Sequence, residues 1–132
     1  MSQPHFLESL LKRRDSRSFR LHNQRSGLDV ATTLETAFSS AERNRGLLGR
    51  DGLPPGQALI IAPTNLVHTF AMRFAIDILF VAKTGRVLKV RRAVPPRRIA
   101  GAWGGFAVVE LAAGGLDASG TRAGDSIEVV TT

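Results

Sequence analysis

Cysteine and tyrosine are absent from this chain of 132 residues, and tryptophan occurs once. Without cysteine, neither a disulfide framework nor a thiolate metal site can form. No apolar segment approaches the roughly 20 residues that a membrane-spanning helix needs. The first 20 residues also lack the charge and apolar pattern of a secretory signal. These absences predict a soluble, cytoplasmic protein.

Established catalytic and nucleotide-binding motifs are missing as well. The sequence contains no P-loop, no G-x-G-x-x-G after a strand, no G-x-S-x-G elbow and no H-E-x-x-H. His68 and Met72 could together ligate a soft metal ion. However, the other two histidines, His5 and His22, lie in the predicted N-terminal extension, so a closed site would need further ligands. We therefore predict no metal and no cofactor.

Charge is the most unusual feature of the composition, with a net charge of +7 at pH 7. A basic surface can bind nucleic acid or an acidic partner, or can simply be a solvated face. Aromatic residues are not interleaved with the basic ones, as base-stacking surfaces usually require. One basic group lies near the N-terminus and consists of Lys12, Arg13, Arg14, Arg17, Arg20 and Arg25. The other, which is the candidate polyanion-binding segment, consists of Arg86, Lys89, Arg91, Arg92, Arg97 and Arg98.

The hydrophobic pattern predicts an N-terminal extension over residues 1–27 and a single β-rich domain over residues 28–132. In the extension, Phe6, Leu7, Leu10 and Leu11 have helical spacing and predict a short amphipathic helix that docks on the domain or on a partner.

The domain alternates short β-rich runs with turn residues, and Lys83-Thr84-Gly85 predicts a hairpin turn. We expect a mainly β (α+β) fold, namely a compact antiparallel barrel or half-barrel. It should contain about six or seven short strands and one or two short helices.

The segment His68–Phe80, HTFAMRFAIDILF, places three polar side chains at the start of an apolar run. His68 and Met72 would share a strand face and are candidates for a ligand site. Asp77 enters the core, where an ionised carboxylate needs a partner. That partner is predicted to be Arg73 or the backbone amides of the adjoining turn, although Arg73 could instead present its charge to an anionic ligand.

Two residues outside this segment complete the candidate ligand site. Glu110 lies within the apolar run FAVVELA, where it could face water or form an acid–base pair with His68 or Asp77. Trp103 lies in a glycine-rich loop, where it could either stack on a ligand or anchor the loop to the core.

Three sequence blocks resemble the family called domain of unknown function 192. They are AERNRGLLGR, HTFAMRFAIDILFVAKTGRVLKV and VVELAAGGLDASGTRAGDSIEV, and the resemblance extends from about Leu28 to Val130. The second block is similar to a subgroup with the pattern His-Thr-Phe-x-Met-Arg-Phe-Pro-Ile-Asp. This chain departs from the family pattern at Leu48, Ala71 and Ala75. The resemblance implies a small, mainly β fold with an irregular barrel or half-barrel, and implies no particular activity.

Three functions are compatible with these features. The first hypothesis is a binding module for a small ligand, a sugar or a protein partner, with the candidate residues His68, Met72, Arg73, Asp77, Trp103 and Glu110. The second is a hydrolase that uses His68 with Asp77 or Glu110. The third is an adaptor that binds nucleic acid or an acidic partner through residues 86–98, which requires the arginines there to share one face.

Overall fold

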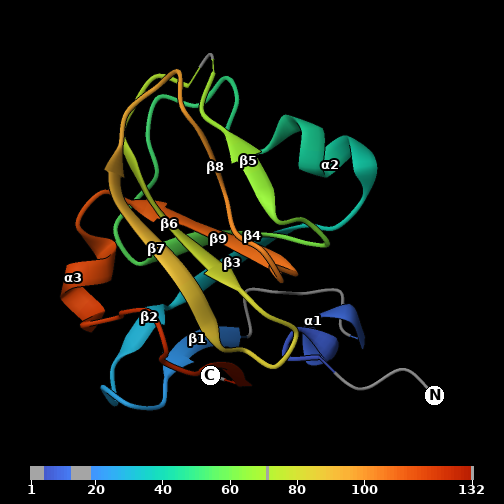
Figure 1. The fold of residues 1–132 in the computed structure, drawn as a ribbon, viewed down its shortest axis with the longest axis vertical. Helices are drawn as coiled ribbons and strands as arrows, with labels where there is room; N and C mark the ends of the chain where they lie inside the picture. Colours follow the sequence, from blue (N-terminus) through green and yellow to red (C-terminus); the bar gives the residue numbers. More distant parts are fainter. Residues whose placement is uncertain (1–4, 13–18, 71, 132) are drawn as a thin grey trace.

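The structure, a computed structural model, describes residues 5–12, 19–70 and 72–131 and is mainly β. Within those residues ten strands form three sheets, accompanied by three short helices (Figure 1). In chain order the elements are α1 (Glu8–Lys12), β1 (Phe19–Asn23), β2 (Asp29–Ala31), β3 (Thr33–Ala37), α2 (Ser40–Arg45), β4 (Gln57–Ile61), β5 (Leu66–His68), β6 (Ile76–Val81), β7 (Val87–Val94), β8 (Ile99–Gly101), β9 (Ala107–Ala112), α3 (Gly115–Ser119) and β10 (Ile127–Thr131). None of these described helices has the length and apolar character needed to cross a membrane.

A five-stranded sheet with the order β3-β4-β9-β6-β7 forms the centre of the protein. All six residues of β6 are buried, because the strand is covered on both faces and paired on both edges. The predicted hairpin is confirmed, since β6 pairs antiparallel with β7 across the Lys83-Thr84-Gly85 turn. Gly85 has a φ of 92°, a conformation that glycine adopts without steric cost.

The central sheet separates two hydrophobic cores. On one face it packs against α1, α3 and the three-stranded sheet β10-β1-β2. On the other face it packs against the segment that follows α2, against Met72 and against the two-stranded sheet β5-β8. Alternation along β9 assigns its residues to the two cores, so that Val109 and Leu111 belong to the first and Val108 to the second. The candidate site lies on the second face.

The mainly β prediction is confirmed, whereas its details need correction. Among the described residues there are more strands and helices than predicted, and none of the three sheets closes into a barrel. One pair, β3 with β4, is parallel. The prediction missed β1, which lies within the predicted extension, and β8, which has only three residues. The segment 28–38 forms two strands, β2 and β3, on either side of Thr32.

Parts of the segment predicted as an N-terminal extension belong to the folded structure. Strand β1 is the middle strand of its sheet, paired with β10 on one edge and with β2 on the other. The predicted amphipathic helix is present as α1, and Leu7 and Leu10 are buried in the first core. The division of the chain at residue 28 remains a prediction.

Candidate functional site

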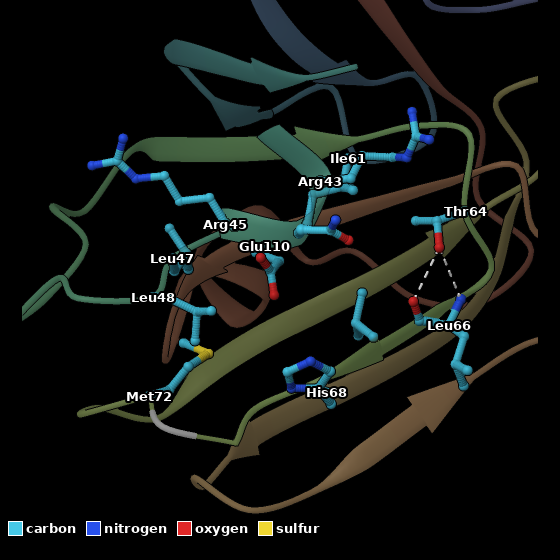
Figure 2. A pocket seen from close by; sticks show the side chains of 13 residues that line it. Arg43, Arg45, Leu47, Leu48, Ile61, Thr64, Leu66, His68, Met72 and Glu110 are labelled. Atoms are coloured by element: carbon cyan, nitrogen blue, oxygen red, sulfur yellow. Dashed lines mark hydrogen bonds between the residues drawn. The ribbon is translucent and has the colours of Figure 1, made fainter. Parts of the chain in front are cut away.

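A pocket of about 450 Å³ opens between α2, β5 and the central sheet (Figure 2). Its rim comes from the helix and the turn after it, one wall comes from β5, and its floor comes from β4 and β9. The residues that line it are Arg43, Asn44, Arg45, Gly46, Leu47, Leu48, Ile61, Thr64, Leu66, Val67, His68, Met72 and Glu110. We call this the Glu110 pocket, after the acidic residue in its floor.

Local sequence positions the helical rim of the pocket. Ser39 caps α2, since its hydroxyl accepts the N–H of Glu42 and the Glu42 carboxylate accepts the N–H of Ser39. These hydrogen bonds lower the pKa of Glu42. The helix ends at Gly46, which has a φ of 48° and turns the chain toward the sheet. Leu47 then enters the second core and completes the wall.

Glu110 is the chemically distinctive residue of the pocket. It lies on β9 between Leu59 of β4 and Ile78 of β6, and its side chain shares their face of the sheet. Only 3% of the residue is exposed, and its carboxyl group points into the pocket (Figure 2). No described residue hydrogen-bonds to this carboxyl group. Burial raises the pKa of Glu110 to about 7, against a smaller opposing effect from the nearby Arg50 guanidinium.

The structure brings His68 and Met72 together with Glu110, although not in the predicted way. Strand β5 ends at His68, and the N–H of Met72 binds the carbonyl of Thr69 in a turn. His68 is therefore exposed at the mouth, with its ring tilted against Phe70 at a centroid distance of 5.6 Å, whereas Met72 is buried. Within the described residues, no hydrogen bond joins His68 to Glu110 or to Asp77.

Asp77 does not belong to the pocket, and its predicted pairing with Arg73 is wrong. Asp77 is directly opposite Leu111 of β9, so it occupies the face away from Glu110. Oδ1 accepts the N–H of Ala93 at 2.8 Å, and Oδ2 accepts those of Gly114 at 3.1 Å and Leu116 at 3.0 Å. The backbone thus holds this carboxylate, but the amides come from distant segments rather than from the adjoining turn.

Arg73 and Trp103 lie outside the Glu110 pocket. The guanidinium of Arg73 pairs with Asp51 at 2.7 Å, and both side chains are largely exposed. Trp103 is 97% exposed, so the alternative in which it anchors its loop to the core is wrong. It lines a separate shallow depression together with Leu66 and Gly101.

The basic residues of segment 86–98 do not form one continuous face. Lys89 and Arg91 are directly opposite Phe80 and Ile78, so they lie over the second core. Arg92 projects to the other side of β7, where its guanidinium binds Asp117 and the carbonyl of Thr121. Arg86, Arg97 and Arg98 are exposed.

Near the N-terminus, only part of the other basic group can be placed. Arg13, Arg14 and Arg17 lie outside the described residues, as does the side chain of Lys12. Arg20 pairs with Asp29, and Arg25 pairs with Asp125.

Sequence reasoning missed the part of the site that comes from AERNRGLLGR. Gly46, Leu47 and Leu48 line the pocket, and a Cβ added at Gly46 would lie 4.0 Å from Oε1 of Glu110. One sequence feature could have indicated this part of the site, namely a pair of leucines between two glycines directly after a capped helix. Among the described residues, no three His, Asp or Glu side chains gather in a way that could hold a metal ion.

Together, the fold and the site define a mainly β domain of three sheets with an acidic residue buried in the floor of a pocket. The sequence profile of the DUF192 family, described as "Uncharacterized ACR", matches residues 21–129. The chain belongs to this family, as its sequence blocks indicated. No curated protein matches the chain.

Two crystal structures resemble this fold. One is a proposed transcription regulator from Sinorhizobium meliloti 1021, with a TM-score of 0.73, 24% identity, and coverage of 84% of this chain and 91% of that one. The other is a protein of unknown function from Novosphingobium aromaticivorans DSM 12444, with a TM-score of 0.72, 25% identity, and coverage of 83% and 82%. These similarities support the fold of the chain.

Proposed function

We propose that this protein is a small-ligand binding module and that its ligand occupies the Glu110 pocket. The proposal depends on one observation, the buried Glu110 carboxyl group that faces the pocket without a hydrogen bond from a described residue. No described side-chain oxygen or nitrogen is both shut off from solvent and without a hydrogen-bond partner, so the Glu110 carboxyl oxygens are reached from the pocket. A ligand that donates a hydrogen bond there replaces water in surroundings that exclude most solvent, where such a bond is stronger than in bulk water.

The remaining features of the pocket support the same function. Its volume of about 450 Å³ lies within the range of small-molecule sites. Leu47, Ile61 and Met72 provide apolar surface, while Glu110 and His68 provide polar groups that could orient a ligand. The lining is more polar than that of a typical small-molecule site, because Arg43, Asn44, Arg45 and Thr64 also contribute to it. Of the predicted ligand-site residues, this proposal keeps His68, Met72 and Glu110.

A thermal-shift screen tests this function. The parent protein, Glu110→Gln and Glu128→Gln would be heated with small amines, alcohols, sugars, carboxylates and nucleotides. Glu128 is a matched control because it lies on β10, outside the pocket. We expect at least one compound to raise the melting temperature of the parent and of Glu128→Gln, and to raise that of Glu110→Gln much less. Equal shifts in all three proteins would place binding elsewhere and contradict the proposal.

Hydrolase chemistry is the second candidate, because His68 and Glu110 line the same pocket. A carboxyl group with a pKa of about 7 is suited to proton transfer near neutral pH. Against this candidate, Arg73 is paired with Asp51 and does not line the pocket. Hydrolysis of p-nitrophenyl esters, phosphates and glycosides that is lost in both His68→Gln and Glu110→Gln would favour it over simple binding.

The adaptor hypothesis receives less support from the arrangement of its basic residues. It requires Arg91, Arg92, Arg97 and Arg98 to share a face, whereas Arg92 is paired with Asp117 away from Arg91. A fluorescence-anisotropy titration with labelled DNA and RNA at increasing salt would test it. Binding through phosphate contacts must weaken steeply with salt.

A further inference from the structure

The positive charges around the Glu110 pocket are directed away from its interior. The guanidinium of Arg43 donates to the carbonyl of Phe38 at 2.5 Å and to Oγ of Ser40 at 3.3 Å. In Figure 2, the guanidinium groups of Arg43 and Arg45 point away from the cavity. The Arg50 guanidinium is held by two hydrogen bonds to Glu35, at 3.2 and 2.7 Å. None of these three arginines neutralises Glu110 by direct contact.

The pocket therefore combines one acidic residue, Glu110, with a mixed lining in which apolar side chains lie beside polar ones such as Asn44 and Thr64. Leu47, Leu48 and Met72 lie on one side of the Glu110 carboxyl group, Ile61 also lines the pocket, and His68 lies across the cavity from Glu110 (Figure 2). A buried carboxylate is strongly stabilised by a cation that also donates hydrogen bonds, because this pairing offsets the cost of desolvation. A neutral hydroxyl donor would leave the negative charge uncompensated, and an anionic ligand would add repulsion.

We propose that the Glu110 pocket binds a small primary monoamine, with the ammonium group on the Glu110 carboxylate and the hydrocarbon part against Leu47, Leu48 and Met72. This inference rests on the proposed binding function and names its ligand class. We expect the ligand to carry only one positive charge, because Arg43 and Arg45 line the rim of the pocket. A second ammonium group near the mouth would be repelled by their charges, so a monoamine should bind more tightly than a diamine of the same length.

Proton balance provides a signature of this binding mode. A primary amine is almost fully protonated at pH 6 and at pH 8, and its ammonium group pairs with Glu110 only when that carboxyl group is ionised. With the pKa of free Glu110 raised to about 7, binding should release close to one proton per amine at pH 6 and close to none at pH 8. Affinity should therefore rise about tenfold between these two pH values.

The other charged groups around the pocket are Arg43, Arg45, Arg50 and His68. The arginines keep their charge throughout this pH range. The measurements are also repeated on His68→Gln, which removes the imidazole from the mouth and leaves Glu110 and the arginines as the charged groups around the pocket.

Isothermal titration calorimetry on the full chain tests the inference with benzylamine, benzyl alcohol and benzoate, which share one ring and differ in their polar group. Hexylamine and 1,6-diaminohexane test the preference for one charge. We expect benzylamine to bind at least tenfold more tightly than benzyl alcohol and benzoate. Glu110→Gln should weaken benzylamine at least tenfold, whereas Glu128→Gln should leave it unchanged. Titrations at pH 6 in two buffers of different ionisation enthalpy count the released protons.

Two further variants guard against loss of folding and against binding elsewhere. Glu110→Asp keeps the charge and should retain more amine binding than Glu110→Gln. Leu48→Trp should fill the cavity and weaken every probe, and circular dichroism would verify that both variants fold. Benzylamine binding that is equally strong in the parent, Glu110→Gln and Leu48→Trp would overturn the inference. Failure of both monoamines to bind at concentrations up to about 50 mM would overturn it too, because small fragments typically bind with millimolar affinity.

The outcomes also separate this inference from the proposed function. If benzyl alcohol, benzoate or a sugar binds more tightly than the amines, and Glu110→Gln or Leu48→Trp weakens that binding, the amine assignment fails and the binding function stands. If every compound that binds does so equally well in the parent, Glu110→Gln and Leu48→Trp, both fail.

Discussion

Asp77 on β6 and Leu116 on α3 are 39 residues apart in sequence, yet the N–H of Leu116 donates to Oδ2 of Asp77 at 3.0 Å. Gly114 donates to the same oxygen and Ala93 donates to Oδ1, so one buried carboxylate joins β6, β7 and the start of α3. Glu110, on the adjacent strand, is also buried but has no such donors among the described residues. This difference distinguishes a structural acid from a candidate functional one.

Replacing Asp77 with Asn should destabilise the protein by about 1–3 kcal/mol, because one carboxylate oxygen becomes an amide donor that faces backbone N–H groups. The free energy of unfolding, obtained from urea denaturation, would measure the loss. Arg73→Met is the matched control. Its exposed ion pair with Asp51 should contribute less than about 1 kcal/mol. A larger effect for Arg73 than for Asp77 would show that these roles have been assigned the wrong way round.

Glu110 should make the stability of the protein fall as pH rises. The pKa of Glu110 increases from 4.5 to about 7 on folding, so the folded state binds more protons between these values. The contribution of Glu110 to the free energy of unfolding is therefore greatest below pH 4.5. It falls by an amount on the order of 3 kcal/mol as the pH rises to 7. Glu110→Gln should lack this loss and should be more stable than the parent at pH 8. Urea midpoints from pH 5 to 8 would test this, and parallel curves for the two proteins would refute it.

Asp125 should have the opposite effect at low pH. Its side chain is 2% exposed and accepts hydrogen bonds from Arg25 and Asn23, and these interactions lower its pKa far below the ordinary value. A lowered pKa adds stability above the unfolded-state value near 4, and this stability is lost as the pH falls.

The Asp125→Asn variant should consequently be less stable than the parent at pH 7, and the difference should shrink toward pH 2. Acid titrations monitored by circular dichroism would show this convergence. Asp117→Asn is a suitable control because that carboxylate is 73% exposed. A difference between parent and Asp125→Asn that stays constant from pH 7 to pH 2 would contradict the assignment.

Trp103 should contribute almost nothing to stability, because its side chain is 97% exposed. Trp103→Ala should change the free energy of unfolding by less than about 0.5 kcal/mol. Since this is the only tryptophan of the chain, its fluorescence reports directly on the loop. We expect acrylamide to quench the native protein almost as efficiently as the unfolded one. A destabilisation above about 1 kcal/mol would instead indicate that the indole packs on the protein.

Much of the fold could be predicted because it depends on local patterns. The β6–β7 hairpin follows from two β-rich runs around Gly85, and α1 follows from apolar residues at helical spacing such as Leu7 and Leu10. Strand β8 was missed, because a strand of three residues shows little alternation. The strand expected around His68 is present as β5, but it ends at His68. Their partners are also distant in the chain, with His68 paired to Ile99.

The candidate site shows the same division. Sequence alone identified His68, Met72, Asp77 and Glu110 as polar or soft side chains within apolar runs, because burying such groups requires an explanation. It could not assign their faces or partners, since the register between β6 and β9 determines that Asp77 and Glu110 point to opposite sides. Tertiary packing then supplied three backbone donors to Asp77 and left Glu110 facing a pocket. The amino-acid sequence therefore determined which polar groups are costly to bury. The tertiary structure determined which of those groups receive hydrogen bonds from the protein itself.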